Sequence, residues 1–155
     1  MNLLILSVGK CAGPEADLCA RYLKRAGQAG RSVGIRDVTV RELPDRTGPS
    51  RTLQESDDIL SKRSPGALVA LDERGALWTS TDFAGRLQAW ADHAVPSVTF
   101  AIGGADGHAQ AVRSAADATM ALSKMTLPHQ LARVILLEQI YRAITICAGH
   151  PYHRA

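Results

Sequence analysis

The chain alternates short apolar runs with amphipathic stretches, separated by polar or glycine-rich connections. A continuous apolar run of five or six residues is typical of a buried strand, whereas apolar residues three and four positions apart mark one face of a helix. The runs 67–71 and 97–102 are examples of the first pattern, and Phe83, Leu87 and Trp90 follow the second. The pattern predicts strands at 3–8, 33–40, 67–71, 97–102 and 119–122, and helices at 14–26, 52–62, 80–91, 109–116 and 128–149.

Local signals indicate where several of these elements begin and end. Thr52 and Glu55 have the spacing of a capping box at a helix start. The last helix should begin near Pro128 and end near Gly149, because proline suits the first turn and glycine the position after the end. After the strand 67–71, the segment 72–75 is expected to turn the chain.

Strands that alternate with helices predict an α/β fold, because parallel strands need crossover connections. We expect a mostly parallel sheet of five to six strands flanked by helices, with residues 1–155 forming a single domain. Ligands of such sheets bind at the carboxyl ends of the strands. The connections 71–75, 103–107 and 122–127 lie at those ends and form the candidate site.

Composition and charge restrict the function only slightly. Hydrophobic residues make up 46% and charged residues 21%, a globular balance that argues against extensive disorder. The net charge of +3 permits nucleic-acid binding without establishing it. The odd number and the spacing of the cysteines argue against a disulfide framework or a zinc site; they are Cys11, Cys19 and Cys147. The apolar start is too short for a signal peptide. We therefore expect a cytoplasmic protein with no metal and no membrane span.

The segment IGGADGH at 102–108 has three glycines within five positions, directly after a predicted strand. Glycines there let the backbone approach a ligand closely and adopt positive φ. A tight turn between strand and helix explains the same residues equally well. The segment is not Gly-x-Gly-x-x-Gly after the first strand, which argues against a dinucleotide site.

Several blocks together resemble one family: VGK near the start, LVALDERG, FAIGGADGH, LSKMTLPHQLARVILLEQIYRA and the terminal PYHR. In order and spacing they resemble the ribosomal RNA large-subunit methyltransferase H family, part of the SPOUT methyltransferases, over essentially the whole chain. The resemblance implies methylation of N3 of a pseudouridine in large-subunit (23S) rRNA, within assembled ribosomes, with S-adenosylmethionine as cofactor. It also implies a C-terminal trefoil knot and a homodimer.

The resemblance implies a cofactor pocket built from the three connections at the carboxyl edge. The glycines would shape the turn, and the segment 122–127 would contribute mainly backbone groups. For the leucines, plain core packing is the alternative that burial alone favours. The implied cofactor-binding residues are Leu71, Gly103, Gly104, Gly107, Leu122, Ser123, Lys124, Met125, Thr126 and Leu127.

Methyl transfer to N3 requires an aligned nucleophile that has lost its imide proton. His129 and His153 are candidate bases, since histidine titrates near neutrality, although each has a structural or phosphate-binding alternative. Arg142 is the main catalytic candidate, because a guanidinium can stabilise the imide anion. Its alternative is an intrahelical pair with Glu138, four residues earlier.

Arg133, Tyr152 and Arg154 are candidate RNA contacts, the arginines through phosphate and the tyrosine by stacking on a base or by packing at a dimer interface. The helix 128–149 is apolar on several faces, which predicts that it lies in the dimer interface. The tail of one subunit would then lie beside the cofactor of the other. Two other functions stay open: a related methyltransferase acting on tRNA, and a non-catalytic ribosome- or nucleotide-binding module.

Overall fold

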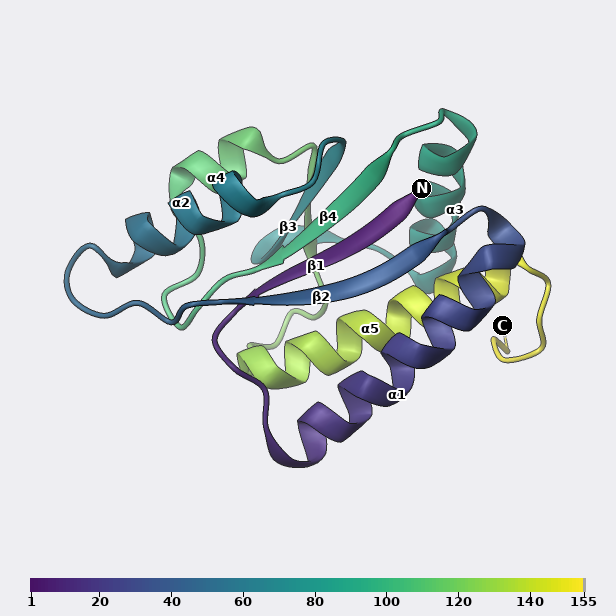
Figure 1. Ribbon diagram of the computed structural model, residues 1–155, viewed down its shortest axis with the longest axis horizontal. Helices are drawn as coiled ribbons and strands as arrows, with labels where there is room; N and C mark the ends of the chain where they lie inside the picture. The colour runs from purple at the N-terminus through teal and green to yellow at the C-terminus, as the bar shows by residue number, and fades with distance from the viewer. Residues whose placement is uncertain (155) are drawn as a thin grey trace.

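Strands and helices alternate along the chain in the computed structural model, which describes residues 1–154 (Figure 1). The strands are β1 (Asn2–Val8), β2 (Asp37–Leu43), β3 (Ala67–Leu77), β4 (Ser97–Ile102) and β5 (Ala118–Ala121). The helices are α1 (Gly13–Gly30), α2 (Arg51–Lys62), α3 (Ser80–Asp92), α4 (Gln110–Ala115) and α5 (His129–Cys147).

The strands form one sheet in the order β2-β1-β4-β3-β5, and every neighbouring pair is parallel. The carboxyl ends of all strands therefore meet at one edge of the sheet. Helices α1, α3 and α5 cover one face, and α2 and α4 cover the other (Figure 1). The predicted α/β fold with a parallel sheet between helices is confirmed, with five strands in the described part of the chain.

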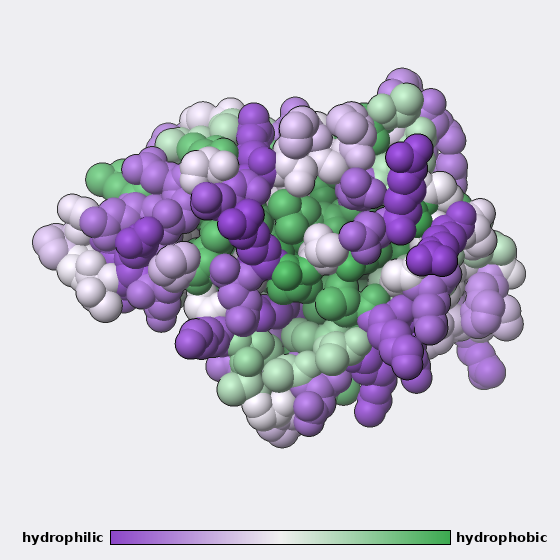
Figure 2. All heavy atoms as spheres, in the orientation of Figure 1, coloured by the Kyte–Doolittle hydropathy of each residue, from purple (hydrophilic) through white to green (hydrophobic). Residues whose placement is uncertain are grey.

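The core lies on both faces of the sheet, because successive strand residues point to opposite sides. All six residues of β4, the central strand, are buried. Phe100 belongs to the larger apolar cluster beneath α1, α3 and α5, and the next residue, Ala101, to the smaller cluster beneath α2 and α4. In Figure 2 hydrophobic residues appear in a middle band, and hydrophilic residues cover much of the outer surface.

Helix α5 packs against α1 and α3, and its buried residues face the core of its own chain. Leu137, Ile140 and Ile144, at helical spacing, are fully buried in this core. Much of the apolar character that predicted a dimer interface is therefore explained within one subunit, so the interface stays a prediction. No helix among residues 1–154 is both long and apolar enough to cross a membrane.

The sequence prediction places the start of the second strand too early, at residue 33. Residues Arg31–Val33 form a short 3-10 helix that continues from α1, and β2 begins only at Asp37. Gly34 follows with φ of +82°, and the backbone N–H of Ile35 donates to the carbonyl of Gly30. This helix-ending turn delays the strand, because a left-handed residue does not fit into a strand.

Two local predictions around the candidate site are also wrong. Glu55 does not form a capping box with Thr52; Ser50 precedes α2 without a side-chain cap, and Glu55 is buried. The segment after Leu71 does not end the strand, because β3 continues to Leu77 after a shift in its register with β5. Gly75 permits this continuation, since a Cβ atom there would lie 2.7 Å from the backbone of Met120.

Candidate functional site

A pocket of about 490 Å³ opens at the carboxyl edge of the sheet. It is lined by three segments that are distant in sequence: the middle of β3 from Leu71 to Arg74, the connection after β4, and the segment between β5 and α5. Ile102 and Met120 contribute apolar walls. The lining combines these apolar walls with several charged and polar side chains, and a concave site of this volume is typical of small-molecule binding.

The glycine-rich turn after β4 presents bare backbone to this pocket. The N–H of Gly107 donates to the carbonyl of Gly104 at 3.0 Å, and Gly107 has φ of +73°. A Cβ atom at Gly103 would lie 3.0 Å from the carbonyl carbon of Gly107, closer than most Cβ contacts in proteins. The backbone of the turn itself therefore favours glycine at positions 103 and 107, and the turn leaves room for a ligand to approach the backbone.

The segment before α5 closes the pocket on another side. Ser123 folds back to accept a hydrogen bond from the N–H of Met125 at 2.9 Å, and Thr126 donates to Glu73 of β3 at 3.1 Å. Leu122 and Leu127 line the pocket with these residues, whereas Lys124 is exposed and does not line it. The structure thus brings together the implied cofactor residues, except Lys124, from all three connections.

Asp72 and Arg113 form an ion pair at the pocket wall that sequence reasoning missed. Arg113 Nε donates to Asp72 Oδ2 at 2.8 Å, and the Asp72 side chain is only 7% exposed. Burial opposes ionisation of Asp72, but hydrogen bonds from the Arg74 N–H and from Arg113 outweigh it and lower the pKa. Asp72 directly follows an apolar run at the carboxyl edge, and this position was the available signal.

His108 is a second residue that sequence reasoning missed. It is buried directly behind the glycine turn, with Nε2 3.1 Å from the carbonyl oxygen of Ala101 and Nδ1 3.2 Å from the position of a Cβ at Gly103. Burial lowers the pKa of His108, which favours the neutral imidazole. The ring therefore acts as a polar support beneath the turn. Among residues 1–154, no cluster of three or more His, Cys, Asp or Glu side chains could hold a metal ion.

The first two turns of α5 carry His129 to the pocket and Arg133 into the core. His129 lines the pocket, and its Nε2 would lie 3.6 Å from a Cβ atom at Gly9. Arg133 is only 3% exposed and donates to Ser7 Oγ, to the carbonyl of Gly9 and to Glu42. This burial does not fit the interpretation of Arg133 as an RNA contact, because little of the side chain is exposed and each of its three nitrogens already donates a hydrogen bond within the chain.

The remaining candidates gather at the other end of α5. Arg142 donates to Glu138 and lies 4.9 Å over the ring of Tyr152, whose hydroxyl also donates to Glu138 at 3.0 Å. The intrahelical pair that was the alternative for Arg142 is therefore present. Arg142 lies thirteen positions after His129 on the helix, about 20 Å away at 1.5 Å per residue. Arg142 therefore does not reach the pocket of its own chain, and His153 and Arg154 do not line it either.

Known proteins are similar to the chain over nearly its whole length. It matches, over residues 1–153, a family described as predicted SPOUT methyltransferase. A ribosomal RNA large subunit methyltransferase H from Methylocella silvestris is 48% identical over 159 residues, 99% of each chain. One from Rhodopseudomonas palustris strain TIE-1 is 49% identical over 160 residues, all of both chains. A solved probable methylase family protein from Haemophilus influenzae has a TM-score of 0.52 at 10% identity, covering 99% of this chain and 70% of that one, which shows similarity of fold alone.

The parallel sheet and the glycine-turn pocket at its carboxyl edge define the class as an α/β protein with a small-molecule site. The family match over nearly the whole chain narrows this class. The chain belongs to the SPOUT methyltransferases, within the ribosomal RNA large subunit methyltransferase H family. The family resemblance of its sequence blocks is thereby confirmed.

Proposed function

We propose that the protein uses S-adenosylmethionine to methylate N3 of a pseudouridine in large-subunit rRNA, within assembled ribosomes in the cytoplasm. One observation carries the proposal: three connections form a pocket at the carboxyl edge, and its glycine turn presents bare backbone. The rRNA substrate is supported by the names of full-length relatives at 48% and 49% identity.

The pocket fits the proposed cofactor by size and chemistry. About 490 Å³ lies within the usual range for small-molecule sites. Leu71, Leu122 and Leu127 offer apolar walls for an adenine ring, and the turn from Gly103 to Gly107 offers backbone groups. Bound S-adenosylmethionine would supply an electrophilic methyl group on its sulfonium. The exposed Lys124 is left out of the proposed set.

His129 is the proposed base for the imide proton, because of the titratable candidates it is the one that lines the pocket. Arg142 can act on the RNA base only in the pocket of a second subunit, since about 20 Å of helix separates it from its own. We therefore retain the homodimer, in which Arg142, Tyr152, His153 and Arg154 would reach the pocket of the partner. The trefoil knot implied by the family is part of the same proposal.

Methyl incorporation into purified substrates tests the function. Ribosomes, separate subunits and tRNA from a strain that lacks the gene would be incubated with labelled S-adenosylmethionine and the protein. We expect label in large-subunit rRNA of assembled ribosomes, located at a pseudouridine by mass mapping. Label in tRNA alone would establish the related tRNA enzyme instead. Calorimetry without any S-adenosylmethionine binding would favour a non-catalytic binding module.

Mixed dimers test the role of Arg142 in the partner pocket. Arg142→Ala should keep cofactor binding and lose methyl transfer. Gly103→Val should also lose methyl transfer, because it damages the pocket. Dimers mixed from the two variants would contain one intact composite site and regain activity. Mixed dimers without any activity would contradict the shared site.

A further inference from the structure

Glu55 is a buried carboxyl directly beneath the pocket. It lies on α2, its exposed fraction is 1%, and it approaches Gly104 of the pocket turn. A Cβ atom at Gly104 would lie 2.6 Å from Glu55 Oε2, and the other two nearest atoms also belong to Glu55. Gly104 has no positive φ, so its backbone conformation would accept a side chain. Any side chain at this position would therefore have to displace the buried Glu55 carboxyl.

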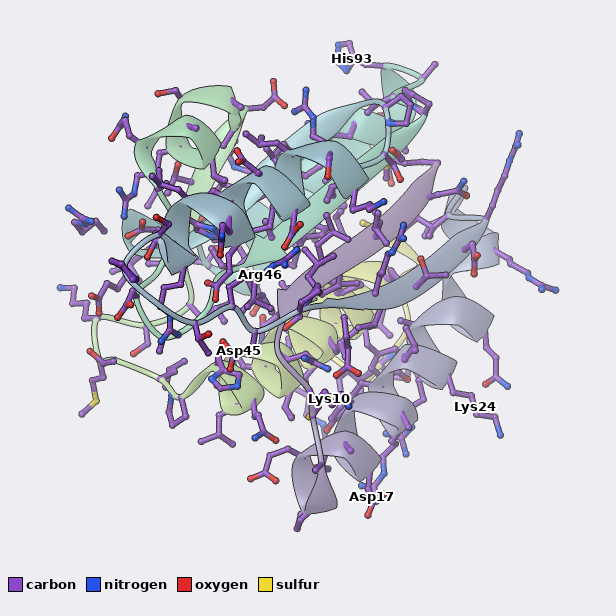
Figure 3. All side chains as sticks on the ribbon, turned by 60° about the vertical axis from the view of Figure 1, so that its left-hand side comes forward. Lys10, Asp17, Lys24, Asp45, Arg46 and His93 are labelled. Carbon is purple, nitrogen blue, oxygen red and sulfur yellow. The ribbon has the colours of Figure 1, made fainter. Side chains whose placement is uncertain are left out.

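Polar contacts link Glu55 to the connection before α2 and, through Arg51, to the pocket turn. The backbone N–H of Arg46 donates to Glu55 Oε1 at 3.1 Å, and Figure 3 shows Asp45 and Arg46 in the connection between β2 and α2. Arg51 Nε lies 3.8 Å from Glu55 Oε1 and 3.4 Å from Asp106, which lines the pocket. The connection before α2, the helix and the pocket turn are therefore linked through one buried carboxyl.

The second oxygen of Glu55 has no hydrogen-bond partner in the described part of the chain, although it is fully buried. Burial also raises the pKa of Glu55. An unpartnered buried oxygen destabilises a fold, so packing of α2 alone does not explain why a carboxyl occupies this place. Its contact with the turn gives a physical reason.

We propose that Glu55 is a positioning residue for the cofactor turn: its carboxyl lies against Gly104 and, through Arg51, aligns Asp106. This inference rests on the proposed S-adenosylmethionine site. A turn held from beneath is pre-organised, so less binding energy is lost in ordering it. Glu55 itself does not contact the ligand, because Gly104 lies between them.

A suppressor experiment tests the contact. Gly104→Ala should weaken S-adenosylmethionine binding by at least about tenfold, because the new methyl group meets Glu55 and displaces the turn. Glu55→Asp shortens the side chain by one methylene and makes room for that methyl. The double variant should therefore bind more tightly than Gly104→Ala alone. Gly85→Ala is the matched control, since nothing lies within 4 Å of its Cβ position, and it should bind like the wild type.

The carboxyl is tested separately by Glu55→Gln, which keeps the size and the acceptor for Arg46 but removes the charge facing Arg51. We expect weaker S-adenosylmethionine binding, unchanged affinity for ribosomes and a normal melting temperature. A merely structural residue would instead lower the melting temperature and leave the affinity of the folded fraction unchanged. Additive losses in the double variant, or wild-type binding by Gly104→Ala, would overturn the inference.

Hydrogen exchange separates this inference from the proposed function. If the wild-type protein does not bind S-adenosylmethionine, the proposed function fails. The amides of residues 103–107 can still be followed without any ligand. Faster exchange at these amides in Glu55→Gln, with unchanged exchange in β1, would support positioning of the turn. Unchanged exchange at 103–107 would overturn it.

Discussion

Arg133 joins α5 to the first strand of the sheet, and its replacement by methionine should destabilise the fold. The guanidinium donates to Ser7 Oγ at 3.2 Å, to the carbonyl of Gly9 at 3.0 Å and to Glu42 at 2.7 Å. Methionine keeps an apolar stem of similar length and removes all three donors. The variant therefore isolates the polar contacts from the packing of the side chain.

The expected loss follows from the surroundings of each acceptor. Glu42 has 42% of its side chain exposed and regains water, so its pair contributes at most about 1 kcal/mol. Ser7 and the Gly9 carbonyl are buried and lose a partner, at about 1–3 kcal/mol each. The variant no longer has to bury a charged guanidinium, which offsets part of this cost. A net loss of about 3 kcal/mol remains, equal to a melting temperature lower by about 6–12 °C.

Urea unfolding followed by circular dichroism measures this loss. The midpoint of Arg133→Met should fall with an unchanged slope, since the surface exposed on unfolding stays the same. Arg21→Ala is the control, because Arg21 is exposed on α1, and its effect should stay within about 0.5 kcal/mol. An unchanged midpoint together with weaker ribosome binding would refute the reasoning and restore Arg133 as an RNA contact.

Three further predictions concern pH, a helix cap and the pocket turn. The hydrogen bond from Arg133 lowers the pKa of Glu42, so the stability it adds is complete above the ordinary value of 4.5 and is lost as pH falls through the lowered value. Urea midpoints below pH 4.5 should therefore fall more steeply in the wild type than in Arg133→Met. Thr79→Ala removes the capping box with Asp82 at the start of α3 and should cost about 1 kcal/mol in thermal unfolding, with unchanged S-adenosylmethionine affinity. Gly107→Ala forces an L-residue to φ of +73° at about 1–2 kcal/mol, and calorimetry should show weaker binding; wild-type affinity would contradict the role of the turn.

The sequence by itself determined the α/β class of the fold and the place of the pocket, whereas the order of the strands in the sheet came only from the tertiary structure. Apolar runs such as 97–102 are long enough to identify a strand buried on both faces, and β4 occupies these residues. Because strands alternate with helices, the connections at 103–107 and 122–127 had to meet at the carboxyl edge, where they line the pocket. These features depend on periodicity and chain order, which are both local properties of the sequence.

Only the tertiary structure decided which polar side chains face one another. Arg113 pairs with Asp72 across 41 positions, and Arg133 bonds the Gly9 carbonyl across 124. Glu55 had the spacing of a helix cap, yet it is buried against the glycine turn. A charged residue looks the same in sequence whether it is solvated or buried. Its role is set by the groups that folding brings within a few ångströms, and those groups lie in elements that only packing places side by side.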